Sequence, residues 1–232
     1  MNGTILRWVL AALAAAPLVA NAAAGPAPAA LEGVETVVVR GEVALELEVG
    51  GSPDLAVAPS SCAEAIEWTL EHGTLTLEPG AGAPAPSCPP RSVSIELSLP
   101  RLSALAVYGP ADVSASELRT AVLHIETDGS GDVDLAGIEC EQLELLVNGS
   151  GDVILRGSAE RQRFDLRGEG DVDAKSLRGE TAELRLSGSG DISVNVSTKL
   201  TVRSSGTGDI LYAGAPAVDS TQLSSGSLRR ID

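Results

Sequence analysis

The chain has 232 residues, with 32 acidic side chains against 16 basic ones, a formal net charge of −16 and only 2% aromatic residues. A surface of this charge repels nucleic acid and anionic lipid, and clusters of basic residues are absent along the chain. Because Phe164 is the single phenylalanine, the core has to be built from Val, Leu, Ile and Ala. That composition favours a narrow, layered interior over a globular core with large side chains.

Residues 1–22 have the features of a secretory signal peptide. They comprise a positive charge at Arg7, an apolar run from Trp8 to Val19, and small residues before an expected cleavage after Ala22. The run is too short for a comfortable membrane span, and no later stretch is apolar enough to cross a bilayer. We therefore expect an exported protein of the periplasm or cell surface of a Gram-negative bacterium, with no transmembrane segment after signal cleavage.

An Ala/Pro linker at residues 23–30 leads into an N-terminal β region at residues 31–108. In "EVALELEVGG", the apolar residues Leu45, Leu47 and Val49 alternate with glutamates. This period of two is typical of a half-buried strand. A Pro/Gly/Ala insert from Pro79 to Pro90 interrupts the series of expected strands.

Three cysteines remain in what we expect to be an oxidising compartment. Cys62 and Cys88 flank a loop-rich region, and we expect them to form a disulfide. Cys140 is then left over, and a free, buried thiol is the favoured interpretation. An intermolecular bridge through Cys140 is the alternative.

A Gly-x-Gly-Asp segment recurs about every 20 residues in the repeat region, residues 109–232, which we expect to be continuous with the N-terminal β region. A glycine lies three residues before each aspartate, another lies one residue before it in five of six copies, and Val or Ile always follows. The anchoring aspartates are Asp112, Asp132, Asp152, Asp171, Asp191 and Asp209. The predicted turn residues are Gly129, Gly131, Asp132, Gly149, Gly151, Asp152, Gly168, Gly170, Asp171, Gly188, Gly190, Asp191, Gly206, Gly208 and Asp209.

Positions seven and five residues before each aspartate are mostly apolar and share a parity, so their side chains face one side of a strand. Each repeat is therefore predicted to consist of a strand, a corner and a second, short strand. One unit cannot bury its apolar face alone, whereas stacked units align like positions into a continuous core. The sequence predicts an all-β protein, a parallel β-solenoid of about 20-residue coils. An antiparallel meander, with the corners as hairpin loops, is the competing topology.

The repeated aspartate has a structural and a functional interpretation. In the structural one, the glycines supply positive φ at a sharp corner and the carboxylate accepts hydrogen bonds from main-chain N–H groups. In the functional one, Asp128, Asp132 and Asp134 are weak calcium ligands. The segment fails the EF-hand pattern at Val133 and lacks the nonapeptide period of calcium-binding β-rolls. The structural interpretation is therefore favoured.

Enzymatic signatures are weak. Two histidines, His72 and His124, cannot make a His/Cys metal cluster, and the "GSG" triplets lack the context of a nucleophile elbow. We predict no catalytic residue and no cofactor. Trp68, Tyr108 and Tyr212 are too few for an aromatic sugar-binding platform. Some outward rows are interpreted as a solvated face: Glu141, Glu144, Arg161, Arg163, Glu183 and Arg185.

The sequence resembles the family described as "Putative auto-transporter adhesin, head GIN domain". The segments "VETVVVRG", "VALELEVG", "GTLTLEPG" and "VSIELSLPRLSAL" match its opening, and the "GSGD(V/I)" corners match its second half. The resemblance covers Leu31 to Leu228 and implies a β-solenoid, export and an adhesive surface role. This chain departs from the pattern in the Cys62 and Cys88 pair, the Pro/Ala insert and Gly-Pro-Ala-Asp at 109–112.

The residues and the resemblance together predict an exported, non-enzymatic structural or interaction protein. It would present an acidic solenoid surface to a protein or carbohydrate of the cell envelope. A carbohydrate-active β-helix enzyme and a calcium-stabilised scaffold are the alternatives.

Overall fold

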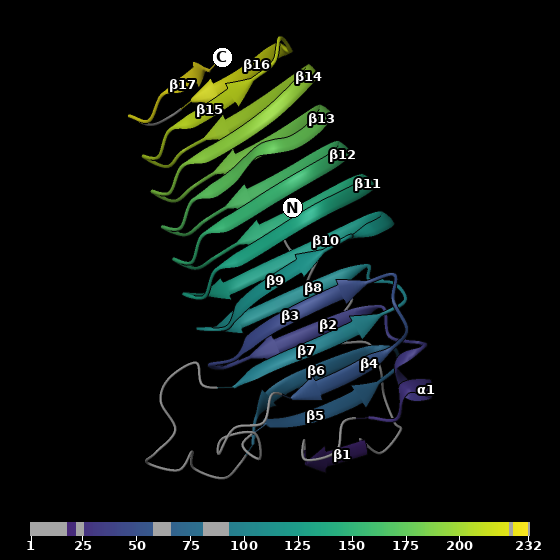
Figure 1. Cartoon of the computed structure of the whole chain (residues 1–232). Coiled ribbons are helices and arrows are strands. Elements are labelled where there is room, and N and C mark those ends of the chain that lie inside the picture. The colour runs from purple at the N-terminus through teal and green to yellow at the C-terminus, as the bar shows by residue number, and fades with distance from the viewer. Residues whose placement is uncertain (1–17, 22–25, 58–65, 81–92, 223–224, 232) are drawn as a thin grey trace.

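The strands of the protein stack side by side along one long axis (Figure 1). This computed structural model describes residues 18–21, 26–57, 66–80, 93–222 and 225–231. Neighbouring strands of the repeat region pair in parallel, and like positions of the two arms are in register, with register shifts near the bend of β11, β12 and β13. The predicted parallel β-solenoid is therefore confirmed, and the antiparallel meander is wrong.

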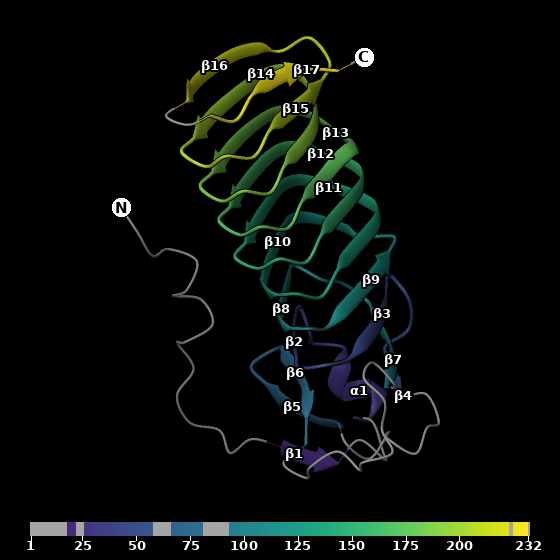
Figure 2. The same cartoon turned by 90° about the vertical axis from the view of Figure 1, so that its left-hand side faces the viewer.

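Each complete coil of the repeat region is one long strand that bends midway, followed by a Gly-x-Gly-Asp corner. Figure 2 shows these coils as successive loops. We call the part after the aspartate the first arm and the part before the next corner the second arm. The long strands are β11 (Val133–Val147), β12 (Val153–Leu166), β13 (Val172–Leu186) and β14 (Ile192–Ser204). In the coil before them the two arms are separate strands, β9 (Asp112–Ser116) and β10 (Arg119–Gly129).

The core consists of columns in which one residue from each coil lies directly above its counterpart. The position seven residues before the aspartate forms one such column, and every member is buried: Leu105, Ile125, Leu145, Phe164, Leu184 and Val202. The β-branched residues that follow the aspartates form a second buried column: Val113, Val133, Val153, Val172, Ile192 and Ile210. Burial of these apolar columns supplies the main driving force for stacking.

The N-terminal β region continues the same stack, but its coils are not stacked in chain order. β2 (Thr36–Arg40) lies between β6 (Thr74–Pro79) and β8 (Ala104–Gly109), and all three are parallel. In the other arm, β3 (Ala44–Val49) lies between β7 (Ser94–Leu99) and β9 (Asp112–Ser116). Since β8 and β9 also pair with β10 and β11, the ladder runs on without a break into the repeats.

Antiparallel strands and a short helix close the N-terminal end of the stack. β4 (Asp54–Val57) pairs with β7, and β5 (Ile66–Glu71) pairs with β6. Helix α1 (Pro28–Leu31) places Leu31 in the core, and Trp68 of β5 is also buried. These elements shield apolar residues that the lowest parallel coil would otherwise expose.

Part of the predicted signal peptide forms a strand. β1 (Leu18–Asn21) pairs antiparallel with β5, while residues 1–17 and 22 lie outside the described residues. Cleavage after Ala22 would remove β1 and leave the outer edge of β5 unpaired. Most of the Pro79–Pro90 insert also lies outside the described residues.

The C-terminal end adds three short strands to the stack. β15 (Ile210–Ala213) and β16 (Ala217–Gln222) pair with the first and second arms of β14, and β17 (Leu228–Arg230) pairs with β15. Among the described residues, no helix is long and apolar enough to span a membrane.

Candidate functional site

The repeated aspartates form a hydrogen-bonded column along one corner of the solenoid. The main-chain N–H of each aspartate donates to the Oδ1 atom of the aspartate one coil before it. The N···O distances are 3.1 Å for Asp132 to Asp112, 2.9 Å for Asp152 to Asp132, 2.9 Å for Asp171 to Asp152, 2.8 Å for Asp191 to Asp171 and 2.7 Å for Asp209 to Asp191. Each carboxylate thus takes the place of a main-chain carbonyl where the chain turns.

The column ends on a residue that sequence reasoning missed. The main-chain N–H and the hydroxyl of Ser227 both donate to Asp209 Oδ1 at 2.8 Å. These two bonds, aided by Arg229, hold the pKa of the Asp209 carboxyl below its usual range. Gly226 packs on Gly208, so "GS" at 226–227 is a seventh, degenerate copy of the corner. The sequence signal for this copy was a glycine before Ser227 and an apolar residue, Leu228, after it, as around five of the six aspartates.

Close packing between coils explains the glycines better than positive φ does. Of the predicted turn glycines, none has φ in the left-handed region, so the expectation of positive φ is wrong for them. A Cβ on Gly149 would instead overlap the carbonyl group of Gly129 in the coil below, and one on Gly151 would overlap that of Gly131. The same overlap recurs along both glycine columns. Glycine is needed there because one main chain lies directly against the next.

The calcium candidates do not converge on one point. Asp128 ends the outer face of β10, Asp132 lies at the corner with its Oδ1 bonded to the N–H of Asp152, and Asp134 pairs with Arg156. Within the described part of the chain, no group of three or more His, Cys, Asp or Glu side chains is arranged to hold a metal ion.

The two interpretations of the column predict different effects at Asp171. Asp171→Ala removes the acceptor for the N–H of Asp191 and should lower the free energy of unfolding by about 1 kcal/mol. Asp171→Asn keeps an oxygen acceptor and removes repulsion from the neighbouring carboxylates, so its stability should stay within about 0.5 kcal/mol of the parent. Urea unfolding of both variants, with and without calcium, is the measurement. Equal losses for Ala and Asn would show that charge, and not the acceptor, is what the column needs.

The cysteines offer no reactive site in the described residues. Cys140 is free and half-buried, and burial raises the pKa of its thiol to about 11. The thiol is therefore almost entirely protonated at neutral pH, which makes it a poor nucleophile. It lines a shallow groove of about 780 Å³ at the bend between the arms, together with exposed glutamates. The predicted disulfide partners Cys62 and Cys88 lie outside the described residues.

The large aromatic side chains are engaged in packing. Trp68 is buried in the N-terminal cap, and Tyr212 packs against the core. The guanidinium of Arg40 lies over the ring of Tyr108, 4.7 Å from the ring centroid. The hydroxyl of Tyr108 donates a hydrogen bond to Glu126 Oε1 at 3.3 Å. Burial, followed by the charge of Glu126, raises the pKa of Tyr108.

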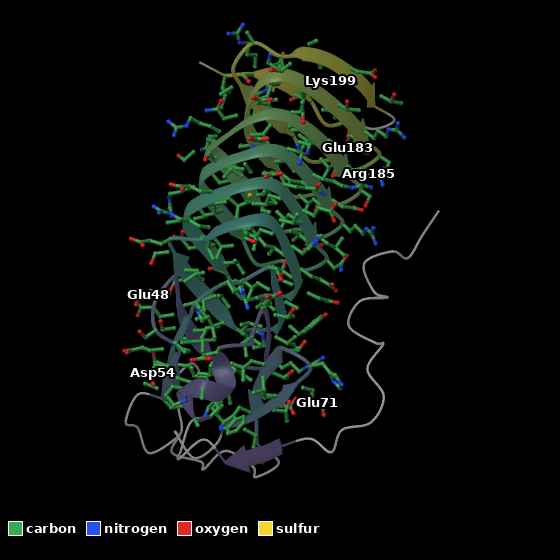
Figure 3. All side chains as sticks on the ribbon, turned by 90° about the vertical axis from the view of Figure 1, so that its right-hand side faces the viewer. Glu48, Asp54, Glu71, Glu183, Arg185 and Lys199 are labelled. Carbon is green, nitrogen blue, oxygen red and sulfur yellow. The ribbon has the colours of Figure 1, made fainter. Side chains whose placement is uncertain are left out.

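The fold gathers basic residues that are scattered in the sequence onto the outer face of the second arms of β12, β13 and β14. This surface, here called the cationic face, carries two carboxylates, Asp165 and Glu183. Its six basic residues are Arg161, Arg163, Arg167, Arg185, Lys199 and Arg203. Glu183, Arg185 and Lys199 lie on one side of the molecule in Figure 3. A shallow groove of about 340 Å³ crosses this face.

Acidic side chains gather on a different part of the surface, in the N-terminal coils. Glu46, Glu48, Asp54 and Glu96 line a groove of about 400 Å³ on the outer face of β3, β4 and β7. Figure 3 shows Glu48 and Asp54 on the other side of the molecule from Lys199, toward the N-terminal end. The cationic face and this acidic groove thus lie on different faces and at different heights of the stack.

Comparison with known proteins assigns the fold and the family. The model of the family described as "Putative auto-transporter adhesin, head GIN domain" matches residues 34–216. No protein of curated function is similar enough in sequence to be counted as a relative.

Solved structures share the architecture. A "putative adhesin" from Bacteroides fragilis NCTC 9343 has a TM-score of 0.81 and 23% identity, covering 93% of this chain and 97% of the other. A "putative lipid binding protein" from Parabacteroides distasonis ATCC 8503 has a TM-score of 0.68 and 19% identity over the same shares. A "putative adhesin" from that strain has a TM-score of 0.61 and 18% identity, covering 85% and 92%. Identities this low establish the fold alone.

Proposed function

Since the chain belongs to the family described as "Putative auto-transporter adhesin, head GIN domain", we propose that it is an exported, non-enzymatic binding protein of the cell envelope, adhesin-like in its action. The observation that carries the proposal is the family match over 34–216, which spans almost the whole stack of coils. The expected signal peptide at residues 1–22 supports export.

The architecture supports a binding role because it fixes side chains on flat outer faces. Residues at equivalent positions in successive coils lie about 4.8 Å apart along each arm, and we call this one-coil step a rung. A ligand that meets such a face finds several groups already positioned, so less conformational freedom is lost on binding. The exposed residues between the two glycines of each corner add a further row: Ser130, Ser150, Glu169, Ser189 and Thr207.

Adhesion and export can be tested separately. Beads coated with the purified protein should be retained on cells of the source organism several times more than beads coated with albumin, an acidic protein of unrelated fold. Equal retention of the two would contradict the adhesive role. Cell fractionation with N-terminal sequencing should find the protein outside the cytoplasm, beginning at Ala23. Recovery of the uncleaved chain from the cytoplasm would contradict export.

A further inference from the structure

We propose that the cationic face binds an anionic glycan, a polysaccharide bearing carboxylate, sulfate or phosphate groups, that lies along the solenoid axis. The inference rests on the proposed binding function and adds the ligand class and the site. The first reason is charge. Six basic side chains stand over three adjacent rungs with only Asp165 and Glu183 among them, in a chain of net charge −16.

Four of the six basic groups of this face are available to a ligand, because Arg167 and Arg185 are held in ion pairs with Asp165 at 2.6 Å and with Glu183 at 2.7 Å. Lys199 and Arg203 are exposed and make no ion pair with any described residue. Arg163 is 3.8 Å from Glu183, and Arg161 is 3.7 Å from Glu141 and 3.8 Å from Glu160; all of these side chains are partly exposed. Exposed pairs of this kind contribute about 0–1 kcal/mol, so an anion that makes closer contacts can displace them. Arginine suits such an anion because its planar fork binds carboxylate, sulfate or phosphate with two parallel hydrogen bonds.

The surroundings of the cationic face orient the ligand. On the bend side it is bordered by Glu141, Glu160 and Glu180, which are exposed. On the corner side it is bordered by the aspartate column. Along the axis the face ends at Glu144 of β11, which lies opposite Arg163, and at Asp219 of β16, which lies opposite Thr201. A polyanion is therefore attracted only over the three coils between these carboxylates. The acidic groove of the N-terminal coils lies several rungs of about 4.8 Å away, beyond a Debye length of about 8 Å in physiological salt.

Hydroxyl groups between the charges favour a sugar over a protein. Thr181 and Thr201 line the groove next to Arg161, Arg163 and Lys199. Stable protein interfaces centre on aromatic or large apolar anchors. The only large hydrophobic side chain exposed among the described residues is Val218, on β16 and outside the cationic face. Hydroxyls and cations in alternation match the hydroxyls and acidic groups of a charged sugar chain.

The test uses dextran sulfate as the anionic glycan and uncharged dextran of the same length as its matched polymer. The purified protein should bind dextran sulfate, measured by isothermal titration calorimetry, and should not bind dextran. Lys199→Gln combined with Arg203→Gln should weaken binding at least tenfold. Arg119→Gln combined with Lys175→Gln removes the same charges from elsewhere on the stack and should change binding less than twofold. Unfolding temperatures of both double variants should match the parent, since only exposed groups change.

Three results would overturn the inference. The first is equal weakening by both double variants, which would mean that net charge, and not this face, governs binding. The second is equally tight binding of poly-L-glutamate, which would mean that sugar hydroxyls play no part. The third is that dextran sulfate does not bind. If the protein then self-associates, and its sedimentation differs in the Lys199/Arg203 variant, the occupant of this face is a second copy of the chain.

These measurements need neither export nor a cell envelope, so they separate this inference from the proposed function. If coated beads fail to adhere while dextran sulfate binding depends on Lys199 and Arg203, the adhesive role is wrong and the glycan site stands. If beads carrying the Lys199/Arg203 variant adhere as well as the parent, and dextran sulfate binding is unchanged, the glycan site is wrong and the adhesive role stands.

Discussion

Gly149→Ala is expected to lower the free energy of unfolding by about 3 kcal/mol or more, enough to lower the unfolding temperature by roughly 10 °C in a chain of this size. The added Cβ would overlap the N, C and O atoms of Gly129, so the main chain itself would have to move. It cannot move freely, because the N–H of Ser150 donates to the carbonyl of Gly129 at 2.8 Å and the carbonyl of Gly149 accepts from Glu169 at 2.9 Å. Separating the coils would break these hydrogen bonds and open the core beside them.

Two control variants separate close packing from the general cost of replacing glycine. Gly33→Ala places a Cβ where no heavy atom lies within 4 Å, so its stability should stay within about 0.5 kcal/mol of the parent. Ser150→Ala changes the exposed residue beside Gly149 and should be equally mild. Thermal unfolding followed by circular dichroism is the measurement. A Gly149→Ala protein as stable as the Gly33→Ala protein would show that the coils do not pack as closely as the structure has them.

The fold of the repeats could be predicted because each coil repeats the same physical constraints. The spacing of the aspartates defined the coil length, and the parity of the apolar positions defined which side chains point inward. Phe164 occupied the same column as Leu145 in the sequence, and the two lie opposite each other in β12 and β11. Stacking in register turns a periodic pattern directly into spatial neighbours.

The cause of the glycine pattern could not be deduced from one coil. An isolated Gly-x-Gly-Asp segment predicts a tight turn. Glycine in a tight turn is usually explained by its tolerance of positive φ. The actual constraint comes from the carbonyl of the neighbouring coil, about 20 residues away, and depends on how closely two corners approach. A recurring glycine at a fixed period can therefore indicate contact between repeats as well as local conformation.

The spatial order of the N-terminal strands could not be predicted from the sequence either. β2 and β3 have the alternation of ordinary strands, and nothing in that pattern places them between strands that follow later in the chain. Their position depends on the long connections around β4 and β5, whose composition carries no register information.

The cationic face was hidden because its members come from three coils. In the sequence, Arg161, Arg185 and Lys199 are separated by acidic residues and appear as a solvated mixture of charges. Only the register shows that Thr181 lies between Arg161 and Lys199 in one column and that Arg185 lies opposite Arg203 in another. The signal becomes visible when the repeats are aligned on their aspartates and the outward columns are read across the coils.

The second large effect is expected from Phe164→Ala, which should lower the free energy of unfolding by about 3–5 kcal/mol. Phe164 is fully buried in the middle of the stack, opposite Leu145 below and Leu184 above. The cavity left by the ring cannot collapse, because both neighbouring coils are held by their own hydrogen-bond ladders. Phe164→Leu is the matched control: it restores an all-aliphatic column and should cost only roughly 1 kcal/mol.

The position of Phe164 makes the loss visible in how the protein unfolds, as well as in how stable it is. In a solenoid each coil is stabilised mainly by its neighbours, so a weak coil in the middle uncouples the two ends. Trp68 lies in the N-terminal cap and is the only tryptophan left after cleavage at Ala22, so its fluorescence reports that end, whereas circular dichroism reports all coils. The two urea transitions should coincide in the parent and in Phe164→Leu, and should separate in Phe164→Ala. Coincident transitions in Phe164→Ala, with a loss under about 1 kcal/mol, would contradict a continuous core that depends on this column.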